Sequence, residues 1–212
     1  MPYFINTIRT PKPGNLPLVV EKVQQSMDQM SIPGLVSVSV SPPGATQNDF
    51  KVVGVLPMAD AEAVEAFHDQ VFSDNMAALK HSARSGISDL CSQENLSISK
   101  VVARSENVDG SLNLKYINRT FIPVKVGKLN DMIELLSEWG ESIDHPYIYN
   151  VSVPMGDIIS QIRVTHMVES FSSLESLNEK IFSDTTRMDK LGELIAGSGR
   201  RALGRITYRN MS

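Results

Sequence analysis

The sequence predicts an α+β fold in which a βαββαβ unit occurs twice along the chain. Three observations lead to this prediction. Short segments alternate apolar and polar residues as strands do, longer segments repeat apolar residues every three or four positions as helices do, and the whole pattern recurs at an offset of 113 residues. The composition, with 42% hydrophobic and 21% charged residues in 212, is typical of a folded globular protein.

In the first half, the helix at 15–30 is indicated by Leu16, Val20 and Val23, which lie on one helical face. Val36 and Val38 alternate with serines, which indicates a strand. The elements expected in this half are strands at 3–10, 34–41, 49–57 and 96–104, and helices at 15–30, 60–72 and 74–84.

In the second half, Leu129, Ile133 and Leu136 repeat the helical stripe, and Val151 and Val153 repeat the alternation. The elements expected here are strands at 114–122, 147–153, 160–168 and 202–209, and helices at 127–143, 171–181 and 184–196. Helix boundaries follow from capping residues: Asp60, Ser170 and Asp184 stand where N-caps are expected, and Gly86 and Gly197 where helices end.

The match between the halves indicates an internal duplication. Tyr3 aligns with Tyr116 and Gly14 with Gly127, and the offset later falls to 110 because the turn at 41–49 is longer than its counterpart. The order βαββαβ is the split ferredoxin-like motif, whose helices cover one face of an antiparallel sheet. The uncovered faces are expected to pack together as a barrel within one chain. The predicted domains are repeat 1 at 1–106 and repeat 2 at 112–212, joined by a linker at 107–111.

Composition and charge argue against several classes of protein. The net charge of −4 is divided evenly between the halves, which argues against a nucleic-acid or membrane-binding face. No apolar run is long enough to span a membrane, and residues 1–14 lack the apolar core of a signal peptide. The single cysteine, Cys91, excludes an internal disulfide and fits a reducing compartment. We therefore expect a cytoplasmic protein.

A resemblance to a known superfamily rests mainly on the second half. Gly156 is followed by the strand segment 162–171, which contains His166, and by the short helical segment 173–177. With the opening segment 9–14, these features resemble the dimeric α+β barrel superfamily, and within it the NIPSNAP-like and antibiotic-biosynthesis-monooxygenase-like groups. That family usually has an aromatic residue two positions after the histidine, where this chain has Val168. The resemblance implies a barrel whose relatives include cofactor-free oxygenases, isomerases and haem proteins, so the fold alone does not select an activity.

His166 is the first candidate catalytic residue. It shares a strand face with Val164 and Val168, where it could act as a general base or ligate haem. A purely structural histidine is the commoner use. The second candidate, Arg119, stands like its counterpart Asn6 in the middle of an apolar strand face, where a polar group must be hydrogen-bonded or line a wet pocket. Arg119 could bind a carboxylate or an enolate oxygen, or it could only reach the barrel rim.

Three aromatic residues complete the predicted ligand site. Tyr3 and Tyr116 occupy equivalent positions in the two halves, and Trp139 lies beside the helical stripe, where it could shield a ligand or simply pack in the core. The run at 197–201 is glycine-rich but leaves a helix and enters a strand, the reverse of a phosphate loop, so its glycines are interpreted as a helix stop.

The leading hypothesis is a small-molecule-binding module or a cofactor-independent enzyme, monooxygenase-like or isomerase-like, acting on a hydrophobic oxygenated compound. The alternative is a non-catalytic interaction or assembly module with a filled barrel, for which the absence of a void above about 300 Å³ would argue. Haem held by His166 is a further, weaker option. No metal site and no other cofactor are expected, and self-association is considered possible.

Overall fold

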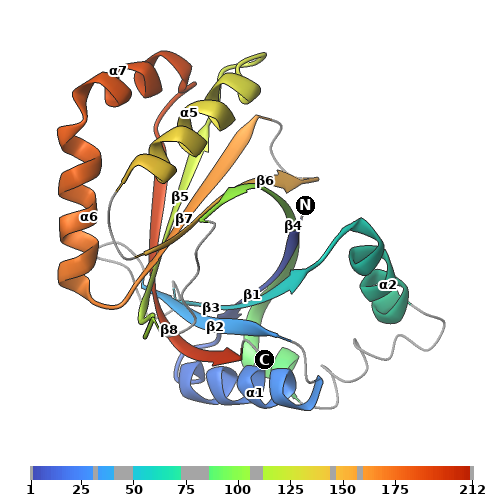
Figure 1. Cartoon of the computed structure of the whole chain (residues 1–212). Coiled ribbons are helices and arrows are strands. Elements are labelled where there is room, and N and C mark those ends of the chain that lie inside the picture. The colour runs from blue at the N-terminus through green and yellow to red at the C-terminus, as the bar shows by residue number, and fades with distance from the viewer. Residues whose placement is uncertain are drawn as a thin grey trace. The chain divides into compact units, whose positions relative to one another are not determined.

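A computed structural model of the chain describes residues 2–30, 33–40, 50–72, 86–105, 112–143, 147–156 and 160–210. The strands are β1 (Tyr3–Pro11), β2 (Gly34–Val40), β3 (Lys51–Met58), β4 (Cys91–Arg104), β5 (Tyr116–Pro123), β6 (Ile148–Met155), β7 (Gln161–Val168) and β8 (Arg200–Asn210). The helices are α1 (Leu16–Met30), α2 (Ala61–Phe72), α4 (Ile87–Leu90), α5 (Leu129–Ser142), α6 (Phe171–Ser183) and α7 (Thr185–Leu194) (Figure 1). The predicted α+β class and the recurring βαββαβ order are confirmed.

The hydrogen-bonded strand order is β1-β3-β2-β8-β5-β7-β6-β4, and it closes on itself as a barrel. The chain divides into two compact units, one from Met1–Ser99 with Gly204–Ser212 and the other from Lys100–Leu203. The strands β4 and β8 therefore each contribute residues to both units. Among the residues that the structure describes, no helix is both long and apolar enough to cross a membrane.

Most elements begin and end within two residues of their predicted bounds, and β4 is the main exception. This strand starts at Cys91, five residues before the predicted start, and the short helix α4 ahead of it was not predicted. The reason is that residues 92–96 are polar or exposed, so no apolar alternation marks them as a strand. The helix predicted at 74–84 and the linker predicted at 107–111 lie outside the described residues.

The three predicted N-caps are confirmed, whereas the predicted helix end at Gly197 is wrong, because α7 already ends at Leu194 with Ile195 as its C-cap. Gly86 is the N-cap of α4, and the helix that it was expected to end lies outside the described residues. The Asp60 carboxylate accepts a hydrogen bond from the Ala63 amide at 2.8 Å, and the Ser170 hydroxyl accepts one from the Ser173 amide at 3.0 Å. The Asp184 carboxylate accepts one from the Arg187 amide at 3.1 Å. Each cap satisfies a backbone donor that the first turn of its helix cannot pair internally.

The same turn precedes α1 and α5. Gly14 and Gly127, which align at the offset of 113, both have a left-handed backbone, with φ of +83° and +80°. Residues with a Cβ rarely adopt this conformation, which explains why glycine stands at both positions.

The first unit builds its core between α1, α2 and a sheet in which β3 lies between β1 and β2. The face of α1 that meets this sheet buries Val19, Val23 and Met27. Of the predicted stripe, Val23 is buried and Leu16 and Val20 are partly buried against the same core, whereas the fully buried Val19 was not predicted. Figure 1 shows α1 lying along one side of these strands. The core is an ordinary apolar helix-on-sheet layer.

The second unit repeats this arrangement, with β7 between β5 and β6. Its helices α5, α6 and α7 bury one face of that sheet. The buried core contains Ile122, Val124, Met132, Leu136, Trp139, Tyr147, Tyr149, Val151, Ile162, Val164, Val168, Leu174 and Leu177.

A glycine fixes how closely α5 approaches β6. A Cβ built at Gly140 would overlap the ring of Tyr149, so the helix can lie against this ring only where it has no side chain. Two hydroxyl groups secure the contact: the Tyr147 hydroxyl donates to the Gly140 carbonyl at 2.9 Å, and the Tyr149 hydroxyl donates to the Ser137 carbonyl at 3.3 Å. The end of α5 is thereby held on the sheet.

Replacing this glycine tests the contact. Gly140→Ala should lower the free energy of unfolding by about 2 kcal/mol, because overlap with the Tyr149 ring outweighs the better helix propensity of alanine. The matched control is Gly192→Ala in α7, where no atom lies within 4 Å of the added Cβ; this change should raise stability by roughly 0.5 kcal/mol. Urea unfolding measures both, and equal stabilities for the two variants would contradict the contact.

Candidate functional site

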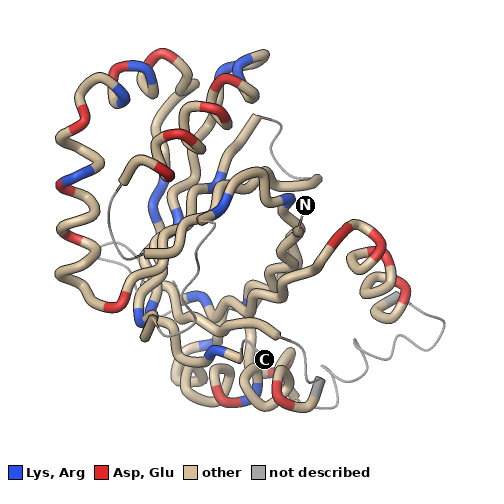
Figure 2. Tube along the Cα trace, viewed as in Figure 1, with Lys and Arg blue, Asp and Glu red and all other residues tan. Residues whose placement is uncertain are grey.

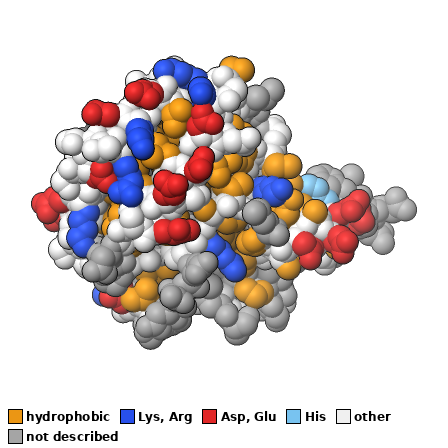
Figure 3. All heavy atoms as spheres, turned by 45° about the horizontal axis from the view of Figure 1, so that its top comes forward, with side chains coloured by type: hydrophobic (Ala, Val, Ile, Leu, Met, Phe, Trp, Pro, Cys, Tyr) orange, Lys and Arg blue, Asp and Glu red, His pale blue; other side chains and the backbone are white. Residues whose placement is uncertain are grey.

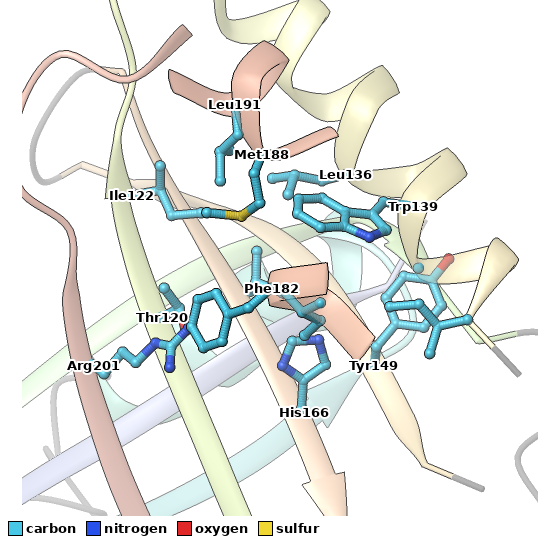
Figure 4. Close-up of a pocket in the computed structure, with 14 residues that line it drawn as sticks. Thr120, Ile122, Leu136, Trp139, Tyr149, His166, Phe182, Met188, Leu191 and Arg201 are labelled. Atoms are coloured by element: carbon cyan, nitrogen blue, oxygen red, sulfur yellow. The ribbon is translucent and has the colours of Figure 1, made fainter. Parts of the chain in front are cut away.

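The second unit contains a cavity of about 120 Å³ between its helices and its sheet. Figure 4 shows the side chains that surround it. Its lining residues are Thr120, Ile122, Leu136, Trp139, Gly140, Ile143, Tyr149, Val164, His166, Ile181, Phe182, Met188, Leu191 and Arg201. The wall is therefore mostly apolar and aromatic, with one imidazole and one guanidinium, which is the usual make-up of a small-molecule site.

The alternation of side chains along the strands determines which residues of the sheet line the cavity. Thr120 pairs with Val164 and Tyr149 pairs with His166 in the antiparallel register, so their side chains lie on the same face as those of Ile122. This is the face that the helices cover. Residues one position away point to the opposite face.

His166 lies in the sheet side of the cavity and is 9% exposed. Its ring centroid is 5.5 Å from that of Tyr147. Burial lowers the pKa of His166 to about 4, and the cationic Arg201 nearby adds to this shift. The imidazole is therefore neutral at neutral pH and has a lone pair with which to accept a proton.

Arg201 lies opposite the apolar helices at one end of the cavity. Its guanidinium carbon is 5.0 Å from the centroid of the Phe182 ring, a cation–π distance. Phe182 itself is 50% exposed, so the pair lies at the boundary between cavity and solvent. Figure 4 shows Arg201 beside Phe182 and Thr120, with His166 on the other side of the ring. Partial burial lowers the pKa of Arg201.

Trp139 forms part of the helix side of the wall and is only 5% exposed. In Figure 4 it lies near Leu136 on α5, and the sulfur of Met188 points into the same space. A tryptophan and a methionine together give a polarizable, adaptable surface for a flat apolar ligand.

Arg119 lies on the other face of the same sheet. It is 5% exposed and neighbours Arg163, which is 7% exposed and donates from Nε to the Ser152 hydroxyl at 3.2 Å. Burial lowers the pKa of Arg119, and the nearby Arg163 cation lowers it further. Because the sheet separates them, Arg119 and His166 do not face one cavity, and the second unit has two chemically different faces.

Positive and negative charges are distributed differently between the strands and the helices of the second unit. The strands β5 to β8 contain several arginines and no acidic residue. Figure 2 shows the acidic residues concentrated on the helices. A negatively charged ligand group would therefore meet cations on the strands.

The remaining predicted site residues do not line this cavity. Tyr116 packs edge-on against Phe171, with ring centroids 6.1 Å apart. Tyr3 and Asn6 belong to the first unit, where Asn6 is buried and its amide donates to the Ser97 carbonyl at 3.4 Å. The structure thus brings His166 and Trp139 together and leaves the other four predicted residues elsewhere.

Sequence reasoning missed Arg201, Phe182 and Tyr149. Arg201 belongs to the glycine-rich run that was interpreted only as a helix stop, and β8 begins at residue 200 rather than 202. A longer strand would have placed Arg201 on the same face as Leu203 by simple alternation. Tyr149 aligns with Val36, so the change to an aromatic ring in the second half was a readable signal.

The cavity does not fit haem as it stands. Its volume of about 120 Å³ lies below the range of about 300 to 1,000 Å³ for ligand pockets, and a macrocycle needs far more room. The same volume is below the void of about 300 Å³ whose absence argues for the non-catalytic module, so the size of the cavity favours that alternative and the binding hypothesis rests on the chemistry of the wall. Within the described ranges, no group of three His, Cys, Asp or Glu side chains has the geometry to hold a metal ion.

No family model matches the chain, and no curated protein matches it. Solved structures do match. A Fusobacterium nucleatum protein, which its name proposes to be a monooxygenase, aligns with a TM-score of 0.73 and 13% identity over 99% of this chain and 94% of its own. An anthrone oxidase-like protein aligns with a TM-score of 0.66 and 11% identity, over 99% of this chain and 92% of its own.

A third match is a ferredoxin-fold protein from Listeria monocytogenes described as related to antibiotic biosynthesis monooxygenases. It has a TM-score of 0.53 and 8% identity, over 98% of this chain and 96% of its own. At these identities the matches show a shared fold, which agrees with the predicted ferredoxin-like α+β class, and they do not carry an activity.

The low pKa of His166 has a consequence for stability. Unfolded histidine has a pKa of about 6.5, whereas the native side chain has one of about 4. Below about pH 6.5 the unfolded chain binds a proton that the native state excludes, so native stability falls until the pH reaches the folded pKa. When the pH is lowered from about 7 to about 5, the free energy of unfolding of the unsubstituted protein should fall by about 2 kcal/mol more than that of the His166→Gln variant. Urea unfolding at both pH values measures this, and parallel losses would contradict the burial of His166.

Proposed function

We propose that the chain is a small-molecule-binding module of the monooxygenase-like kind, with its site in the cavity of the second unit. The observation that carries the proposal is His166, a buried neutral imidazole that faces an aromatic-walled cavity beside the cationic Arg201. The names of the solved structures that share the fold support the same class.

The ligand we propose is a hydrophobic, oxygenated aromatic compound. Trp139, Tyr149 and Phe182 offer ring surfaces, and a cavity of about 120 Å³ has room for about one aromatic ring. Arg201 is placed to hold a phenolate or enolate oxygen by a charge-assisted hydrogen bond.

The reaction we propose is oxygenation without a cofactor. His166 accepts a proton from an activated methylene group, and Arg201 stabilises the resulting enolate. Dioxygen adds to the carbanion carbon, and protonated His166 returns its proton to the peroxide. Loss of the second C–H proton and cleavage of the O–O bond then give a ketone and water, so that a methylene group and a dioxygen molecule become a carbonyl group and a water molecule.

The electrostatics suit a base that works only with its substrate. Burial and Arg201 both oppose protonation of His166 in the empty cavity. A substrate anion between the two side chains offsets the charge of Arg201 and stabilises the imidazolium, so proton transfer is coupled to ligand binding. An isomerase-like reaction would use the same base and return the proton to another carbon without consuming oxygen.

Oxygen uptake and the emission of Trp139, the only tryptophan, test this proposal with single-ring phenols and aryl ketones that carry an activated methylene group. We expect binding to change the emission and turnover to consume oxygen. His166→Gln should keep binding and lose at least about a hundredfold in rate, the usual scale of general-base catalysis. His68→Gln, on α2 in the first unit, is the matched control and should behave as the unsubstituted protein.

Each outcome selects a different interpretation. Binding and turnover without oxygen uptake would favour an isomerase-like enzyme. No response of Trp139 to any compound would reject the cavity as a ligand site and favour the interaction module with a filled barrel. The NIPSNAP-like resemblance, the internal duplication, self-association and a cytoplasmic location remain predictions from the sequence.

A further inference from the structure

A second pocket opens beside the cavity, on the outer side of the end of α5. It has a volume of about 300 Å³ and is formed by Trp139, Ser142, Ile143, Lys180, Ser183, Asp184 and Arg187. We call it the outer pocket. Trp139 and Ile143 line both spaces, so the two adjoin along these side chains.

The two spaces differ in chemistry. The inner cavity is walled by apolar and aromatic groups, whereas the outer pocket carries Lys180, Arg187 and Asp184. Two cations and one carboxylate leave it cationic. The inner cavity is smaller than ordinary ligand pockets, whose range is about 300 to 1,000 Å³, and the outer pocket lies at the lower end of that range.

The charges in the outer pocket are already held in place. The Asp184 carboxylate caps α7 by accepting from the Arg187 amide and pairs with the Arg187 guanidinium at 2.6 Å. These hydrogen bonds lower the pKa of Asp184, so the carboxylate stays ionised and fixes the guanidinium. A guanidinium has five N–H donors, and among the described residues this ion pair engages Nη1 alone, which leaves donors for a ligand.

The end of α5 would oppose an anion, because the last carbonyl groups of a helix carry partial negative charge. Hydroxyl groups cover two of them: the Ser142 hydroxyl donates to the Trp139 carbonyl at 2.9 Å, and the Tyr147 hydroxyl donates to the Gly140 carbonyl at 2.9 Å. This reduces the negative potential at the wall between the two spaces.

We propose that the outer pocket binds the anionic end of a ligand whose aromatic end occupies the inner cavity, so that the ligand class is an aromatic acid. This inference rests on the proposed function, since it assigns the polar half of the same ligand. Lys180 and Arg187 bind the acid group, and Trp139 lies between the two halves of the molecule.

The surrounding surface offers no competing explanation for anion selectivity. Figure 3 shows acidic and basic side chains interspersed with apolar ones over the visible face, onto which α5 and α7 turn. Among the described residues shown there, neither sign of charge forms a broad continuous area. The charges on this face therefore do not favour an anionic ligand by themselves, and a preference for one would come from the residues of the outer pocket.

Two fluorescent probes test the proposal: anilinonaphthalene sulfonate, which is anionic, and phenylnaphthylamine, the uncharged compound without the sulfonate. Energy transfer from Trp139 reports that a probe is bound, and the variants locate the site. The double variant Lys180→Gln/Arg187→Gln should lower the affinity for the sulfonate by about tenfold. It should change the affinity for the uncharged probe by less than about twofold. Added salt should weaken only the sulfonate.

Lys190→Gln is the matched control for the single variant Lys180→Gln, since each removes one positive charge and Lys190 lies at an exposed position on α7 outside the pocket. It should change neither affinity. If Arg187→Gln weakens the fold, as urea unfolding would show, Lys180→Gln alone carries the test with a smaller loss in the same direction.

The outcomes separate the two proposals. If the double variant loses affinity equally for both probes, or loses none for the sulfonate, the anionic subsite is overturned while the inner cavity is left as a ligand site. Failure of both probes to accept energy from Trp139 in the unsubstituted protein overturns the proposed function together with this inference.

Discussion

The contact between Gly140 on α5 and the ring of Tyr149 on β6 is the constraint on which the functional region depends. It allows the end of α5 to lie close to the sheet, and the hydroxyls of Tyr147 and Tyr149 hold it there through helix carbonyl groups. Trp139 precedes this glycine, so its position follows from the same contact. Because Trp139 lines both the inner cavity and the outer pocket, the shape of each depends on how α5 is placed.

The sheet of the second unit separates two kinds of polar group. His166 lies on the helix-covered face, where burial keeps it neutral, and Arg119 and Arg163 lie on the opposite face as buried cations. Strand alternation makes this separation unavoidable, since residues of opposite parity point to opposite faces. The proposed chemistry therefore uses Arg201, which reaches the His166 side from β8, in the role first expected of Arg119.

Much of the fold could be predicted because local patterns and tertiary packing agree. The helical stripe at Val23 and the caps at Asp60 and Ser170 needed no long-range information. The site was harder, because it joins side chains from strands and helices that are distant in sequence. The alternation of side chains along the strand predicted the sheet face on which His166 lies. Its neighbours Arg201 and Phe182 depend on the register of β8 and the packing of α6, which no local sequence pattern encodes.

The central claim is that the second unit has an open, apolar space beside His166. Diffraction from crystals of the protein pressurised with xenon tests this most directly, because xenon enters empty apolar cavities and adds strong density there. The account predicts a xenon atom among Ile122, Trp139 and Met188. Side chains that fill this space and exclude xenon would contradict the claim, and with it the assignment of the cavity as a ligand site.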